Sequence, residues 1–168
     1  MTALRDTLLG QLDIAWQLTS YHLDGLTTDA CLWRPAPRGL HVVRAGDVWR
    51  AEWPESEGYD IGPTSIAWIT WHITFWWSMA IDHAFGAKTL AREHVTWPGN
   101  AEAVRSTIAD LHARWREQIG TLDDNALRER RATWPIDRPL GEIVAWANLE
   151  LMKNAAELGY ARFLYAVR

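Results

Sequence analysis

Three polar residues on two apolar segments are the strongest candidates for chemistry in this sequence. His72 lies in the run Ile66-Ala-Trp-Ile-Thr-Trp-His-Ile-Thr-Phe-Trp-Trp-Ser-Met-Ala-Ile, and Glu150 and Asn154 lie four residues apart near the C-terminus. Side chains four apart on a helix share one face, so Glu150 and Asn154 can converge on one point. A His from one helix and two donors from another can bind a divalent metal and leave positions open for water or substrate.

The same side chains can also form a cluster without metal. A buried carboxylate is costly unless a metal, a proton or a charged neighbour accompanies it. A His, a carboxylate and an amide can satisfy one another by hydrogen bonding. Glu157, one turn beyond Asn154, and His22, on the first helical face, are alternative ligands. The sequence leaves both interpretations of the site open.

Helical periodicity defines the elements that position these residues. Leu4, Leu8, Leu12 and Ala15 begin an apolar face that predicts a helix over about 2–25. Ser65 or Thr64 caps a second helix that ends near Phe85, and Asn100 caps a third that ends at Gly120. A polar stretch over 123–131 can form a short helix, and the last long helix runs from about Pro139 to Tyr165. Four long helices predict an all-α four-helix bundle.

The connection over 27–64 is unusually long for a compact domain. His41-Val-Val and Val48-Trp49 flank Ala-Gly-Asp, which predicts a small β-hairpin or an ordered flap. His41, His83, His94 and His112 form no close pair at ligand spacing, so we expect them at exposed or locally hydrogen-bonded positions.

Composition limits the classes of function. With 168 residues, 48% of them hydrophobic, the chain predicts a single domain over 1–168. A formal net charge of -4 and the absence of a Lys/Arg run argue against nucleic acid as a partner, and no apolar run reaches the length of a membrane span.

No export signal is recognised, and Cys31 alone allows no internal disulfide, so the cytoplasm is the expected location. A buried, inert thiol is expected at Cys31. The 12 tryptophans fill the core or line a pocket or interface.

Three segments together resemble the DinB-like superfamily. They are Trp33-Arg-Pro-Ala-Pro, Ser65-Ile-Ala-Trp-Ile-Thr-Trp-His72, and Glu150-Leu-Met-Lys-Asn154-Ala-Ala-Glu157-Leu-Gly. The resemblance implies an up-down-down-up bundle, commonly a homodimer. It also implies a divalent metal, zinc or nickel, held by His72, Glu150 and the residue at 154. Family members typically carry His at the last position, and the Asn154 oxygen is a poor ligand for zinc-like ions.

Members with an assigned activity use low-molecular-weight thiols such as bacillithiol or mycothiol in transfer or isomerisation reactions. The resemblance therefore implies a metal-dependent, S-transferase-like enzyme in which the metal activates a thiol or water. The alternative is a metal-free bundle with a degenerate site. Such a bundle either binds an apolar small molecule in an aromatic cavity roofed by residues 27–64 or serves a structural role as a dimer.

Overall fold

The chain is mostly helical, as the predicted all-α class requires. The computed structural model describes residues 2–55, 58–130, 134–135 and 137–168. The long helices are α1 (Ala3–Leu23), α3 (Ile66–Phe85), α4 (Ala101–Gly120) and α6 (Leu140–Ala166). The short elements are α2 (Thr28–Leu32), β1 (Val42–Ala45), β2 (Val48–Ala51), η1 (Tyr59–Ile61), η2 (Arg92–His94) and α5 (Asp124–Arg128).

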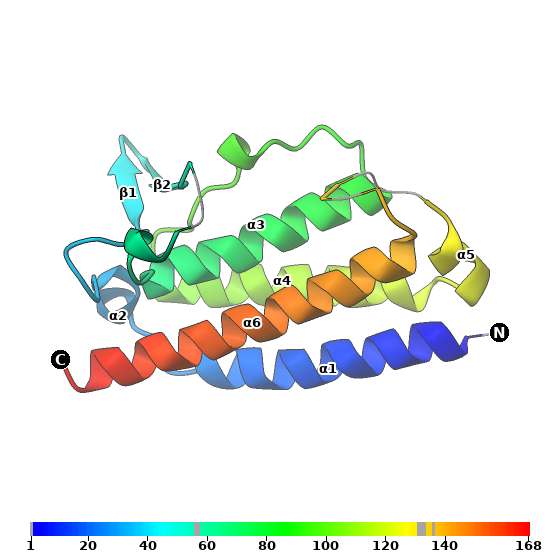
Figure 1. The fold of residues 1–168 in the computed structure, drawn as a ribbon, viewed down its shortest axis with the longest axis horizontal. Helices are drawn as coiled ribbons and strands as arrows, with labels where there is room; N and C mark the ends of the chain where they lie inside the picture. The colour runs from blue at the N-terminus through cyan, green and yellow to red at the C-terminus, as the bar shows by residue number, and fades with distance from the viewer. Residues whose placement is uncertain (1, 56–57, 131–133, 136) are drawn as a thin grey trace.

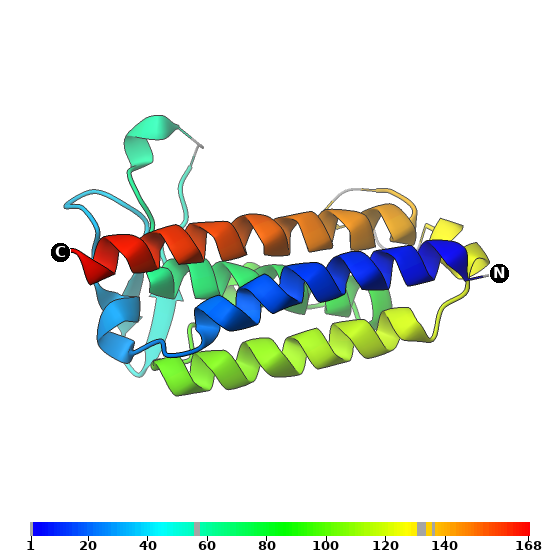
Figure 2. The ribbon, with the colours of Figure 1, turned by 90° about the horizontal axis from the view of Figure 1, so that it is seen from below.

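The four long helices lie roughly along one axis (Figure 1). α1 and α6 run side by side from the end that holds the N-terminus to the end that holds the C-terminus, and α3 and α4 run in the opposite direction. Figure 2, seen from below, shows α1 lying between α6 and α4, with α3 behind them. Each of α1 and α3 contacts both α4 and α6. This arrangement places His72 of α3 opposite the polar positions of α6.

Local sequence signals explain where the central helices begin. The side chain of Ser65 accepts a hydrogen bond from Trp68 N at the start of α3, and that of Asn100 accepts one from Ala103 N at the start of α4. Both predicted caps are confirmed, because each oxygen satisfies a backbone N–H that the first helical turn leaves free. The short helix expected over 123–131 is present as α5; its predicted last residue, Arg131, lies outside the described residues.

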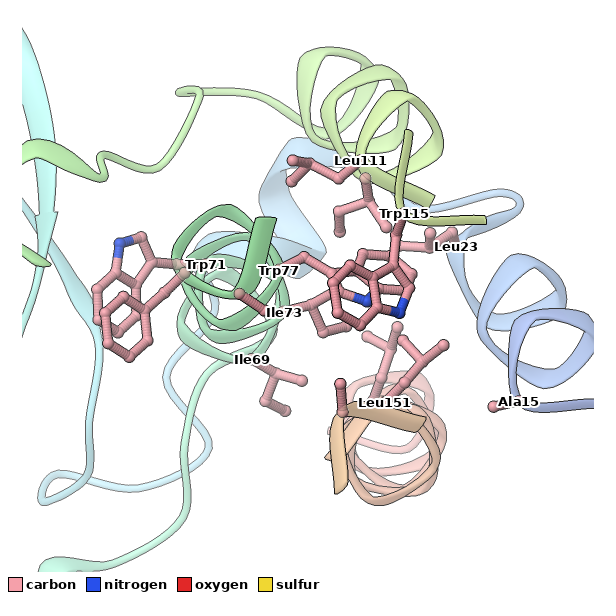
Figure 3. Close-up of a cluster of buried hydrophobic side chains, with 14 of the residues drawn as sticks. Ala15, Leu23, Ile69, Trp71, Ile73, Trp77, Leu111, Trp115 and Leu151 are labelled. Carbon is pink, nitrogen blue, oxygen red and sulfur yellow. The ribbon is translucent and has the colours of Figure 1, made fainter. Parts of the chain in front are cut away.

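α3 is buried on nearly every side, as its apolar sequence predicts. Figure 3 shows Trp77 of α3 and Trp115 of α4 both pointing into the interior between the helices, while Trp71 projects from the opposite side of α3. Trp71 and Trp115 are almost fully buried. A helix that is apolar all round must be covered on every face. Here the other long helices cover one side, and the long connections cover the other.

The predicted hairpin in the long connection is confirmed. β1 and β2 pair antiparallel, with Val42 opposite Ala51, and Gly46 takes a positive φ in the turn between them. The short helix α2 in the same connection was not predicted, since its five residues are too few to show a helical period.

Tryptophan N–H groups form hydrogen bonds that join α3 to the connections on either side of it, between α2 and α3 and between α3 and α4. Trp68 Nε1 donates to the carbonyl of Glu52 at 2.7 Å, and Trp71 Nε1 donates to that of Val95 at 2.8 Å. Trp97, which lies in the connection between α3 and α4, donates its Nε1–H to Thr70 Oγ1 of α3 at 3.1 Å. Since each indole also buries a large apolar surface, these side chains provide packing and polar attachment together.

Within the described part of the chain, no helix combines the length and the hydropathy needed to cross a membrane.

Candidate functional site

His72 lies buried between α3 and α6 and forms hydrogen bonds through both ring nitrogens. Trp76, one turn along α3, donates its indole N–H to His72 Nε2. An indole nitrogen can only donate, so Nε2 must present its lone pair. The ring proton is therefore on Nδ1, which lies 2.9 Å from Asn154 Oδ1 and donates to it. The two partners together fix the tautomer of His72.

Asn154 is buried, and the orientation of its amide follows from its two partners. Its Nδ2 donates to the backbone carbonyl of Glu150 at 2.7 Å, one turn earlier on α6. Its Oδ1 is then left to accept the proton of His72 Nδ1. The His72–Asn154–Trp76 cluster consequently pairs the polar atoms at its centre without any added ion.

The surroundings of His72 keep it neutral. Burial lowers the pKa of His72 from 6.5 to about 4, an effect to which the positive charge of Lys153 adds and which the hydrogen bond to Asn154 opposes. The Trp68 ring stacks on the imidazole with their centroids 4.7 Å apart. With this pKa, His72 carries no charge at neutral pH. Because the Nε2 lone pair already accepts the N–H of Trp76, the ring has no free lone pair with which to accept a substrate proton.

Glu150 has a neighbouring cation of its own. Its Oε2 lies 3.2 Å from Lys153 Nζ, three residues along α6. That oxygen is shielded from solvent, and the contact with Lys153 is an ion pair without the geometry of a hydrogen bond. The carboxylate predicted to bind a metal is thus already balanced by a lysine.

Neither of the two alternative ligands forms a hydrogen bond with His72 among the described residues. Glu157 occupies an exposed position of α6. The His22 ring lies against Gly159, because a Cβ atom on Gly159 would come within 2.6 Å of His22 Nε2. Gly159 is five residues beyond Asn154, about 7.5 Å along the helix. The structure therefore brings His72 and Asn154 into contact, with Glu150 beside them.

Little free space adjoins the cluster. A cavity of about 10 Å³ is lined in part by Trp76, Trp77, Glu150 and Asn154. Since one water molecule needs about 10–15 Å³ by this measure, the cavity admits at most a single water. The aromatic side chains around His72 fill the space in which a ligand would have to lie.

The expectation for His41 was wrong. We expected it to be exposed or locally hydrogen-bonded, but it is 3% exposed, and among the described residues neither ring nitrogen has a hydrogen-bond partner. Its backbone N–H, rather than its ring, bonds to Glu52 Oε2. Cys31 is buried as expected, and burial raises its pKa to about 12, so its thiol stays protonated at neutral pH.

The family model described as the DinB superfamily matches residues 11–158. The chain belongs to the DinB superfamily. No curated protein and no solved structure matches it. Membership confirms the resemblance found in the sequence and leaves the activity of this DinB protein to be inferred from its own residues.

The donors at the centre of this DinB protein do not fit the predicted metal. In a metal-bound His, the second ring nitrogen normally carries a proton and donates it to an acceptor. His72 Nε2 instead faces the N–H of Trp76, so a metal on Nδ1 would place two donors against each other. Among the described residues, no group of three His, Cys, Asp or Glu side chains is arranged to hold an ion.

The roles of Trp76 and Lys153 were missed in the sequence. Trp76 lies four residues after His72 and Lys153 three after Glu150, so both spacings place them on the same helical faces as their partners. Helical spacing was the available signal, but it shows that two side chains are neighbours without showing which polar atoms meet.

Proposed function

We propose that this DinB protein is a metal-independent small-molecule-binding bundle. In it, the His72–Asn154–Trp76 cluster occupies the position at which the family resemblance predicts a metal. The observation that carries the proposal is the pairing of both His72 ring nitrogens, one with a group that can only donate. The ion pair of Glu150 with Lys153 supports it, because the lysine supplies the positive charge that a metal would bring.

A cleft of about 580 Å³ lies elsewhere on the bundle, between α3 and α4. Ligand sites are usually concave, of about 300–1,000 Å³, and apolar with a few polar groups. The cavity beside His72 falls well below this range.

The rival is the metal-dependent enzyme, with zinc or nickel activating a low-molecular-weight thiol or water. Elemental analysis of untagged protein, after incubation with each metal and gel filtration, separates the two. We expect negligible metal in the wild type and in His72→Ala alike. One bound metal per chain that is lost in His72→Ala would overturn the metal-independent assignment.

The binding role itself is tested by a screen of chemically diverse small molecules against melting temperature. A ligand that binds the folded state raises apparent stability, by about 2.7 kcal/mol at a hundred times its dissociation constant. A reproducible rise with saturation behaviour supports the proposal. A screen in which no compound shifts the midpoint or the tryptophan emission contradicts it.

A second role, as a homodimer, is favoured by one face of the molecule. Tyr160 and Phe163 of α6 are 65% and 70% exposed, and Tyr21 of the adjacent α1 is 73% exposed. Leu149 of α6, Ile14 of α1 and Val167 just beyond α6 are exposed as well, and Figure 2 shows α1 and α6 lying side by side. Large exposed apolar surfaces commonly mark contacts between proteins.

Sedimentation velocity tests the homodimer. We expect the wild type to sediment as a dimer and Phe163→Glu, which places a charge at an exposed position, to sediment as a monomer with an unchanged helical spectrum. Glu142→Gln, at an exposed position in the first turn of α6, is the control. A monomeric wild type at tens of micromolar would refute this role without affecting the binding proposal.

A further inference from the structure

A cleft with an apolar floor lies between the C-terminal half of α3, residues 86–94 and α4. Its volume is about 580 Å³. Figure 1 shows the segment between α3 and α4 running back alongside α3, and Thr89, Leu90 and His94 of this segment line the cleft. Ile81 and Leu111 are buried at the floor, and Phe85 and Leu90 pack against the same core. This floor suits the apolar body of a ligand.

One wall of the cleft is held in place by Asp82. Its Oδ2 accepts a hydrogen bond from Leu90 N at 2.9 Å. Backbone hydrogen bonds from Leu90, Thr89 and Ala87 lower the pKa of Asp82. Because these N–H groups hydrogen-bond to its carboxylate, Asp82 holds residues 87–90 in place. The wall is thus formed before any ligand arrives, which reduces the entropy lost on binding.

The opposite wall carries a cation that has no partner among the residues that the structure describes. Arg114 lines the cleft from α4, and among the described residues it forms no hydrogen bond or ion pair. Gln118, one turn further along, lines the cleft as well, so its amide can act with the guanidinium. Arg116 of the same helix differs, since it pairs with Asp13 of α1 at 3.0 Å. Among the described residues, the guanidinium of Arg114 is therefore free, whereas that of Arg105 donates to the carbonyl of Leu26 and that of Arg116 pairs with Asp13.

We propose that this cleft binds a small monocarboxylate with an apolar body. Its carboxylate would pair with Arg114 and accept a further hydrogen bond from Gln118. A planar guanidinium matches a carboxylate through two parallel hydrogen bonds, and such charge-assisted bonds are stronger than neutral ones. The hydrophobic part would lie over Phe85, Leu90 and Leu111. The inference rests on the proposed binding function and adds the location and chemical class of the ligand.

Two probes that differ only at the polar end test the carboxylate. Isothermal titration would compare 3-phenylpropanoate with 3-phenylpropan-1-ol on the full chain. We expect the acid to bind at least tenfold more tightly than the alcohol. We also expect Arg114→Gln to remove that preference while leaving the melting temperature close to that of the wild type. Arg116→Gln is the matched control and should keep the preference.

The location is tested by filling the cleft. Ser78 lines it from α3 and is only half-buried, so Ser78→Trp should occupy the space without disrupting the core. We expect it to abolish binding of both probes, with circular dichroism reporting an intact fold. Unimpaired binding to Ser78→Trp would place the site elsewhere.

The remaining outcomes separate this inference from the function on which it depends. Equal affinity for acid and alcohol, or equal effects of Arg114→Gln and Arg116→Gln, would overturn the carboxylate assignment. Failure of both probes at millimolar concentration would overturn the ligand class, while the melting-temperature screen decides independently whether this protein binds small molecules.

Discussion

Trp76 donates its indole N–H to Nε2 of His72, and this contact decides which ring nitrogen of the histidine carries the proton. With Nδ1 protonated and bonded to Asn154, the face of His72 that points toward α6 presents a donor where a metal would need a lone pair. A single indole four residues away thus opposes the metal chemistry that the family resemblance implies.

Removing the indole N–H that bonds to His72 and placing a histidine at position 154, as the family resemblance implies, should create a metal site. We expect the double variant Trp76→Phe/Asn154→His to bind one zinc ion per chain, because Nδ1 can then present its lone pair beside Glu150 and a second histidine. Asn154→His alone should bind zinc at least tenfold more weakly, since Trp76 still fixes the tautomer. Titration against a colorimetric zinc chelator measures both affinities.

The control for this variant is the triple change that adds His72→Ala, which should lose the metal. Equal zinc affinity with and without Trp76 would show that the indole does not govern the site.

The stability of the protein should fall in acid through His72. Its pKa is about 4 in the folded chain and 6.5 in the unfolded chain, so between these values the unfolded state binds more protons. The free energy of unfolding contributed by this residue is therefore constant above about pH 6.5 and decreases as the pH falls toward 4. The expected loss is about 3 kcal/mol, at 1.36 kcal/mol for each pKa unit.

Urea unfolding at several pH values measures this loss against His72→Gln, whose amide can accept from Trp76 and donate to Asn154 without titrating. The difference between wild type and variant should change across pH 4 to 7. Parallel pH profiles for the two proteins would rule out His72 as the titrating group.

Loss of the Asn154 amide should destabilise the bundle. Asn154→Leu leaves the buried Nδ1–H of His72 without an acceptor, at a cost of about 1–3 kcal/mol. In a His72→Phe background the same substitution should cost clearly less, because no donor remains to be satisfied. A double-mutant cycle by urea unfolding gives the coupling between the two residues, and additive effects would argue against the hydrogen bond.

Gly62 should be required for the close backbone contact with Arg38 within the connection between α1 and α3. It has φ +88, and a Cβ atom there would lie 2.5 Å from the carbonyl oxygen of Arg38. Gly62→Ala should therefore increase amide hydrogen exchange across β1 and β2, whereas the bundle helices change little. The matched control is Gly46→Ala, which has φ +64 but open space around it, so it bears the backbone strain alone. Similar exchange in both variants would contradict the role of the close contact.

The sequence by itself determined where the long helices lie and which residues are candidates for the functional site. Helical periodicity with caps at Ser65 and Asn100 located the long helices, because both signals depend on residues within a few positions of one another. The uniformly apolar segment around His72 predicted a covered central helix for the same reason. The i, i+4 spacing of Glu150 and Asn154 placed both on one side of α6.

Only the tertiary structure decided what the candidates do. Whether His72 meets a lone pair or a donor depends on side-chain rotamers, and these are set by packing between α3 and α6, which lie about 80 residues apart along the chain. The ring of His41, unpaired within the described part of the chain, and the cleft beside Arg114 likewise arise from segments that the sequence separates widely. Periodicity states which face a residue occupies, whereas hydrogen-bond direction and free volume exist only once the helices have packed.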